Sequence, residues 1–244
     1  MLVSGAYEKA KLYIEAHSKE KAELQKKKIK IEPGPCITIS RQTGAAAGEI
    51  SELLIDLLKP MTKNPELEWA IFDKNLIEKV IADHNLPERI SEYLTEEKHS
   101  FLNSIMNELF GIHPSPLRLV YKTTKTILQL AQIGNCIIVG RAANIITRNL
   151  ENTYHIRIIA PLKKRIEQVQ KHFNYSEEEA KKFIEKEEEK RREYVKHYFH
   201  KDIDDPSLYD IVINTERHSF DETAQILTYA ITTKLKNYFR KISF

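Results

Sequence analysis

The sequence predicts a parallel α/β domain, and three observations support this fold class. From residue 36 onward, short apolar β-branched segments alternate with longer amphipathic ones. One short segment, at 136–139, is wholly apolar, as expected of a strand covered on both faces. The first short segment passes through a loop of small residues directly into an amphipathic helix. This alternation is typical of parallel strands joined by crossover helices.

Composition restricts the functional class. The 244 residues suffice for one large domain with appendages, and 30% charged residues are typical of soluble proteins. A net charge of +3 is compatible with a phosphorylated ligand but too weak to indicate nucleic acid. No apolar run approaches the roughly 20 residues of a membrane span, and the N-terminus lacks a signal-peptide pattern. Cys36 and Cys136 begin apolar strands, so we expect buried thiols and a cytoplasmic location without membrane partners.

Residues 1–34 are interpreted as a charged N-terminal helical arm. The segment 7–30 is dense in Lys, Glu and Ala and ends in a basic run at 25–30. It is expected to be a solvated or packing appendage, with an anionic-ligand patch as the alternative. The prolines at 33 and 35 then separate it from the domain proper at 35–244.

Apolar periodicity predicts the elements of that domain in order. Strands are predicted at 36–39, 69–72, 136–139, 154–159 and 211–213. Helices are predicted at 49–59, 74–82 and 221–238. A mostly helical insertion is expected at about 87–133, broken near 111–116, and a highly charged helical stretch at about 161–200.

The segment 36–51 has the frame of a phosphate-binding loop. Backbone N–H groups and the positive N-terminus of the following helix can receive an anion there. The loop nevertheless lacks the Lys-Ser/Thr pair of the G-x-x-x-x-G-K-[ST] motif. The residues expected to bind phosphate are Ser40, Arg41, Gln42, Thr43, Gly44, Ala45, Ala46, Ala47, Gly48 and Glu49.

Four stretches, at 37–44, 72–74, 138–143 and 205–215, carry a resemblance to a known family. In their order and spacing the chain resembles the cytidylate kinase-like family of P-loop nucleoside monophosphate kinases, over roughly residues 36–230. The resemblance implies a five-stranded sheet in the order 2-3-1-4-5, with a helical insertion and a helical lid. It also implies ATP with Mg²⁺ as donor and CMP or dCMP as acceptor.

The loop departs from that family's pattern. Ala47 stands where a cytidylate kinase has its phosphate-binding Lys, and Glu49 stands where it has the magnesium-binding Ser/Thr. Gly48 takes the place of an Arg that is usual in the related loop. Arg41, at the carboxyl edge of the sheet, is the candidate to replace the lost charge. The alternative is a protein that kept the fold and acts as a nucleotide sensor or scaffold.

The resemblance assigns the acceptor phosphate to Arg141, which follows Gly140, because a guanidinium fork fits phosphate. Ala142 stands where the family motif has Asp. Asp73 and Lys74 follow the second strand, and two roles remain open there: capping of the next helix, or contact with the acceptor.

Arginines of the charged stretch are the remaining candidates. Arg165 and Arg191 would close over the transferring phosphate as catalytic residues with Arg141, and Arg192 would assist substrate binding. Alternatively, their spacing from Glu residues makes ordinary helical ion pairs. Arg157 lies within a predicted strand, so it either reaches the phosphate site or pairs with a carboxylate.

Other chemistries find little support. The nine histidines lack metal-ligand spacing, so no protein-held metal site is predicted. The acidic segment at 204–210 contains Pro206, which suits a turn better than a metal site. An RNA- or membrane-surface binder would depend on the short basic run at 25–30 alone. Nucleotides are therefore the expected partners, and the long helices are compatible with a homodimer.

Overall fold

The computed structural model describes residues 7–17, 33–63, 67–82, 96–110 and 118–240. Its centre is a five-stranded sheet in the order β2-β3-β1-β4-β5, with every pair of strands parallel. The α/β class and the strand order predicted from the sequence are confirmed. The strands are β1 (Cys36–Arg41), β2 (Ala70–Phe72), β3 (Cys136–Val139), β4 (Thr153–Ile159) and β5 (Ile211–Asn214).

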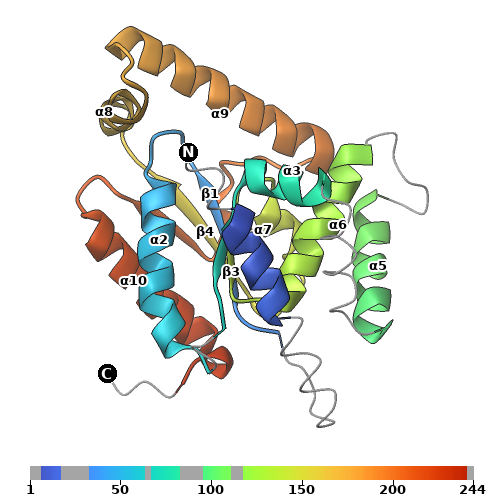
Figure 1. Cartoon of the computed structure of the whole chain (residues 1–244). Coiled ribbons are helices and arrows are strands. Elements are labelled where there is room, and N and C mark those ends of the chain that lie inside the picture. Colours follow the sequence, from blue (N-terminus) through green and yellow to red (C-terminus); the bar gives the residue numbers. More distant parts are fainter. Residues whose placement is uncertain (1–6, 18–32, 64–66, 83–95, 111–117, 241–244) are drawn as a thin grey trace.

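Helices cover both faces of the sheet (Figure 1). One hydrophobic cluster joins α2 (Ala47–Leu58) and α10 (Phe220–Lys234) to one face. A second joins the helix at 7–17, α3 (Lys74–Ala82), α5 (Glu96–Phe110), α6 (Arg118–Ile133) and α7 (Ala143–Ile146) to the other. Side chains alternate between the faces along β1, so Ile37 and Ile39 belong to the first cluster and Cys36 to the second.

The helix at 7–17 is a packed element. Ala10, Tyr13 and Ile14 are fully buried, and the Tyr13 hydroxyl donates to the carbonyl of Gly134. Residues 7–17 therefore pack onto the domain, while the anionic-ligand alternative for the segment stays a prediction. The basic run at 25–30 lies outside the described residues.

Several predicted boundaries were wrong by one or two residues. β1 continues to Arg41, because Ser40 and Arg41 still pair with β4. α2 begins at Ala47 rather than Glu49, because Ala46 takes a left-handed conformation (φ 58°) and ends the loop there. β2 begins one residue later than predicted, β4 begins one earlier and β5 ends one later. The last predicted helix divides into α10 and the short 3₁₀ helix η3 (Lys236–Tyr238).

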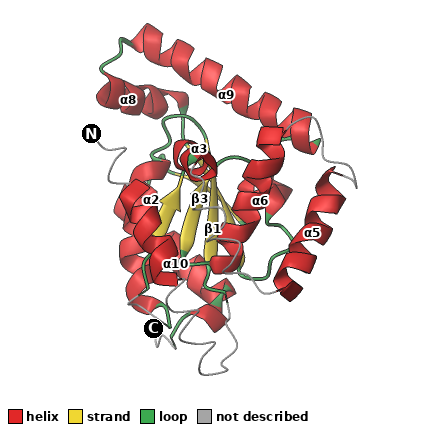
Figure 2. Cartoon of the chain, turned by 45° about the vertical axis from the view of Figure 1, so that its right-hand side comes forward, coloured by secondary structure: helices red, strands yellow, loops and turns green. Residues whose placement is uncertain are grey.

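The charged stretch forms a helical hairpin, α8 (Leu162–Phe173) and α9 (Glu177–Phe199), called the lid below. Asn174 ends α8 in a left-handed conformation, and Ser176 begins α9 with a capping box to Glu179. In two views α9 crosses above the loop that joins β1 to α2 (Figures 1 and 2). Among the described residues, every helix is too short or too polar to cross a bilayer.

Candidate functional site

The loop between β1 and α2 fits closely against the lid. Gly44 has φ 80°, and a side chain there would overlap the backbone of Arg165 at the start of α8. Glycine is therefore required at this position for both conformation and space. The side chain of Arg165 also contacts the loop, because its Nη1 donates to the carbonyl of Thr43 (3.5 Å). Its Nε donates to the carbonyl of Ala160 (2.9 Å), just after β4.

The anion-binding groups of the loop hold a carboxylate of the lid. The N–H and the hydroxyl of Thr43 both donate to Oε1 of Glu188, at 2.5 Å and 2.7 Å. Nη1 of Arg191 donates to Oγ1 of Thr43 (2.6 Å) and to Oε1 of Glu188 (3.2 Å). One oxygen of Glu188 thus receives an amide, a hydroxyl and a guanidinium, the groups that bind a phosphate oxygen elsewhere.

Sequence reasoning missed Glu188. The available signal was its three-residue spacing to Arg191, in the stretch that matches the family's Asp-x-x-Arg pattern. That spacing is equally typical of a surface ion pair, so it could not by itself place the carboxylate in the loop.

Arg41 approaches β3 at the point where that strand ends. Gly140 has φ 87°, and a Cβ on it would overlap the guanidinium of Arg41. Burial is the main reason that the pKa of Arg41 is lowered to about 10, and the positive charge of Arg191 lowers it further. The carboxylates of Asp73 and Glu188 oppose this lowering. The glycine that precedes Arg141 therefore also makes room for the second arginine.

Arg191 is in a comparable environment, since burial lowers its pKa as well. The guanidinium of Arg191 is close enough to Arg41 for its charge to lower the pKa of Arg41. Two desolvated cations are favourably placed to interact with an anion, because their charges are poorly screened by water.

Two cavities meet at these arginines. The larger, of about 1040 Å³, is lined by the loop at 42–49, by α2 and by the lid. The smaller, of about 160 Å³, is lined by Ser40, Lys74, Gly140, Arg141 and Tyr209, among others. Arg41, Val139 and Arg191 line both cavities. The two guanidiniums therefore stand at the boundary between the two spaces.

Arg141 forms one wall of the smaller cavity. It has a left-handed backbone (φ 57°), pairs with Glu78 of α3 and lies 5.3 Å from the ring centroid of Tyr194. Its Nε is buried and has no hydrogen-bond partner in the part of the chain that the structure describes. The side chain is thus held in place with one N–H donor still unused.

Asp73 and Lys74 lie at the same sheet edge. Oδ1 of Asp73 accepts from the N–H of Leu76 (2.8 Å), which is the capping role weighed from the sequence. Asp73 also lines the larger cavity, while Lys74 lines the smaller. Capping and ligand contact are therefore compatible for Asp73.

Arg157 and Arg192 converge on Asp204. Arg157 is 3% exposed, donates to Oγ of Ser40 (2.9 Å) and pairs with Asp204. The carboxylate-paired alternative is therefore the one observed for Arg157. Arg192 pairs with Asp204 (3.2 Å) and Glu189 (3.3 Å). Neither Arg157, Arg192 nor Arg165 lines either cavity, so their proposed phosphate roles stay predictions.

Glu49 faces the lid. Its Oε1 accepts from Nε2 of Gln168 (2.8 Å) and lies 3.4 Å from Nε2 of His172, both on α8. The nearest hydroxyl on α2, that of Ser51, donates to the carbonyl of Ala47 (2.6 Å). The described residues include no group of three or more His, Cys, Asp or Glu side chains suited to a metal.

The acidic segment at 204–210 makes a turn, as favoured from the sequence. Oδ1 of Asp205 accepts from the N–H of Ser207 (2.9 Å) and begins the 3₁₀ helix η2 (Pro206–Leu208). Oδ2 of Asp210 accepts from the N–H of His155 (2.8 Å), which ties the turn to β4.

Comparison with known proteins is consistent with this arrangement. The sequence model of the cytidylate kinase-like family matches residues 36–217. A cytidylate kinase of Methanocaldococcus jannaschii is 32% identical over 107 residues, covering 43% of this chain and 60% of the relative. One from Pyrococcus horikoshii is 36% identical over 105 residues, covering 43% of this chain and 53% of the relative. These matches thus span little more than half of each relative's length.

Among solved structures, an uncharacterized protein from Eubacterium ventriosum has the same fold. The TM-score is 0.63 at 18% identity, and the alignment covers 82% of this chain and 99% of that one. At this identity the similarity concerns the fold alone.

Proposed function

The chain belongs to the cytidylate kinase-like family, and on that premise we propose that it transfers a phosphoryl group from ATP to a pyrimidine nucleoside monophosphate, CMP or dCMP. The observation that carries the proposal is the position of Arg41 and Arg191 on both cavities. A transferred phosphoryl group would pass from ATP in the larger cavity to the acceptor in the smaller one. Arg41 and Arg191 line both cavities and would contact that group during the transfer.

The donor phosphates would bind the loop amides and the N-terminus of α2, in the place that the Glu188 carboxylate now takes. Arg141 would hold the acceptor phosphate with its guanidinium fork. An oxygen of that phosphate would attack the terminal phosphorus of ATP, and ADP would leave with the electron pair of the broken P–O bond. The protein would contribute positioning and charge neutralisation, which dominate this class of reaction.

Arg41 and Arg191 would take over the charge that Ala47 and Gly48 cannot supply. Burial lowers the pKa of both arginines by more than the nearby carboxylates raise it. Both cations would interact strongly with the negative charge that develops on the equatorial oxygens of the transferring group, because little water screens them, and they would thereby stabilise the transition state.

A nucleotide-binding sensor or scaffold is the second candidate. The loop lacks the ammonium group of the usual motif, and Glu188 occupies the amide and the hydroxyl of Thr43. A protein that binds nucleotide but turns it over poorly would have this combination.

A coupled assay of ATP against CMP, dCMP, UMP and AMP distinguishes the candidates. The kinase proposal expects ADP formation with CMP or dCMP in preference to UMP and AMP. No product at high protein concentration, with nucleotide binding retained in calorimetry, would select the sensor instead.

A further inference from the structure

The tip of the lid carries three neighbouring aromatic side chains, Phe173, Tyr175 and Phe183, called the lid aromatic cluster below. The ring centroid of Phe173 lies 5.4 Å from that of Tyr175 and 5.2 Å from that of Phe183. The ring centroids of Tyr175 and Phe183 are 5.8 Å apart. Phe173 is 52% exposed and Tyr175 37%. Two large aromatic side chains are thus partly exposed side by side.

Phe173 and Tyr175 lie outside the hydrophobic core of the lid. Its hydrophobic core consists of Ile166, Val169, Ala180 and Ile184, with Phe183 packed against it at the edge. Phe173 and Tyr175 stack nearly parallel beyond that core, at an interplanar angle of 24°. Two partly exposed aromatic rings therefore remain after the lid has buried its aliphatic residues.

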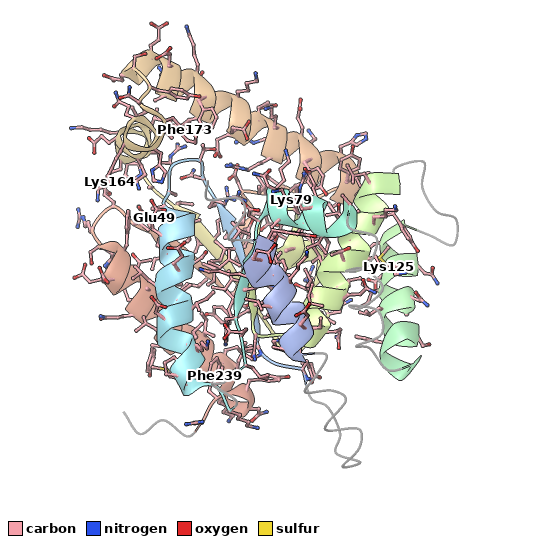
Figure 3. All side chains as sticks on the ribbon, in the orientation of Figure 1. Glu49, Lys79, Lys125, Lys164, Phe173 and Phe239 are labelled. Atoms are coloured by element: carbon pink, nitrogen blue, oxygen red, sulfur yellow. The ribbon has the colours of Figure 1, made fainter. Side chains whose placement is uncertain are left out.

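This surface is held over the phosphate-binding loop. Gln168 and His172 of α8 both contact Glu49 in the first turn of α2, and Phe173 follows His172 directly. Figure 3 shows Phe173 on the lid above Glu49 at the start of α2. Phe173 and Phe183 line the same cavity of about 1040 Å³ as the loop residues 42–49. The cavity thus joins an anion-binding end to an aromatic wall.

An anion-binding end continuous with an aromatic wall matches the two parts of a nucleoside triphosphate. Bases stack on aromatic side chains for about 1–3 kcal/mol per base, whichever base is present. We propose that the lid aromatic cluster stacks the nucleobase of the phosphoryl donor, with Phe173 as the principal ring. This inference rests on the proposed function, because that function makes a nucleoside triphosphate the ligand of the larger cavity.

Stacking also sets the expected donor selectivity. Every nucleobase has a π-face, so a site that uses stacking discriminates weakly between bases. ATP and GTP are therefore expected to bind within a few-fold of each other, whereas inorganic tripolyphosphate, which has no base, engages the loop alone.

Calorimetric titration with ATP and with tripolyphosphate tests the proposal. Phe173→Ala should weaken ATP binding by about 5- to 150-fold, the range that the stacking energy predicts, and leave tripolyphosphate affinity unchanged. Phe173→Tyr, which keeps a ring, should restore ATP affinity. Leu162→Ala is the matched control, because Leu162 is an exposed α8 residue outside both cavities.

Each outcome decides a separate point. Equal ATP affinity for Phe173→Ala and the unmodified protein would overturn the stacking surface, and so would equal losses for ATP and tripolyphosphate. A failure of the unmodified protein to bind tripolyphosphate, with ATP binding still sensitive to Phe173, would instead overturn the phosphate role of the loop and support the stacking surface.

Discussion

At the scale of single residues, the site is defined by charges whose partners come from distant parts of the chain. Glu188 lies 145 positions from Thr43 and yet accepts both hydrogen bonds that the amide and the hydroxyl of Thr43 donate. Its carboxylate is an internal anion in a loop built to receive one. A phosphate must therefore compete with the protein's own side chain.

Neutralising Glu188 should strengthen phosphate binding. In Glu188→Gln the side-chain amide accepts weaker hydrogen bonds from Thr43 and no longer repels phosphate. We therefore expect the affinity for tripolyphosphate to rise by about tenfold, which corresponds to the lower end of the free energy of a hydrogen bond to a charged group. Calorimetry measures it. Glu189→Gln is the control, because Glu189 is the neighbouring carboxylate and pairs with Arg192 on its own helix. Unchanged or weaker binding in Glu188→Gln alone would contradict the competition.

Replacing Arg141 should affect the acceptor selectively. Arg141→Ala removes the guanidinium from the wall of the smaller cavity. We expect the KM for CMP to rise at least about tenfold, or turnover to be lost, with the affinity for ATP retained. Steady-state kinetics with each substrate varied in turn, and Arg217→Ala as an exposed control, provide the measurement. Unchanged kinetics would remove Arg141 from the site.

At the scale of elements, Asp204 links β4 to the lid. It follows the end of α9 and pairs with Arg157 inside the sheet and with Arg192 on α9. Because Arg157 is almost fully buried, the carboxylate of Asp204 compensates the free-energy cost of burying its positive charge. This connection holds the last turns of α9 above the sheet edge.

Asp204→Asn should therefore destabilise the fold. Loss of one partner of a buried ion pair costs about 3–5 kcal/mol, and we expect about 2 kcal/mol here because Asp204 is 45% exposed. Urea denaturation measures the change. Glu193→Gln, an exposed neutralisation on the same helix, should shift stability by less than about 0.5 kcal/mol. Equal stabilities of the two variants would show that Arg157 does not need Asp204.

At the scale of the whole molecule, two buried histidines make stability depend on pH: one links two strands of the sheet and the other lies in the packed N-terminal helix. His155 of β4 lies 2.8 Å from Oγ1 of Thr38 on β1 and 3.4 Å from Oγ1 of Thr153. His17 contacts the carbonyl of Tyr13 in the packed N-terminal helix. Burial lowers the pKa of both histidines below the ordinary value of 6.5. For His155, the charge of Arg148 adds to this lowering, and the charge of Asp210 opposes it.

Stability should therefore decrease as the pH falls below about 6.5. The unfolded chain binds protons at these histidines near their ordinary pKa, whereas the folded protein binds them only at lower pH. Their contribution is complete above pH 6.5 and is lost toward the folded pKa. Thermal melts between pH 7.5 and 5 measure the slope, and His155→Gln should flatten it. Carboxylates with lowered pKa, such as Asp205, act only at more acidic pH. A flat profile above pH 5 would contradict the effect.

Much of the fold was predictable because its signals are local. The wholly apolar β3 and the helix at 74–82 have the predicted bounds, since hydrophobic runs and periodicity specify them directly. The boundaries at Arg41 and Ala47 were less predictable. There, pairing with β4 and a left-handed alanine decide where the strand ends and the helix begins.

The sequence by itself determined the class of the protein: alternating strands and helices, a phosphate-binding frame without its ammonium group, and a family resemblance. Only the tertiary structure decided which charges meet. It brings Glu188 into the loop, Arg41 against Gly140 and Arg157 to Asp204. The periodicity of apolar residues indicates which face of each short segment is buried. Contacts between side chains of distant segments depend instead on how the sheet and the lid pack together, which no local pattern specifies.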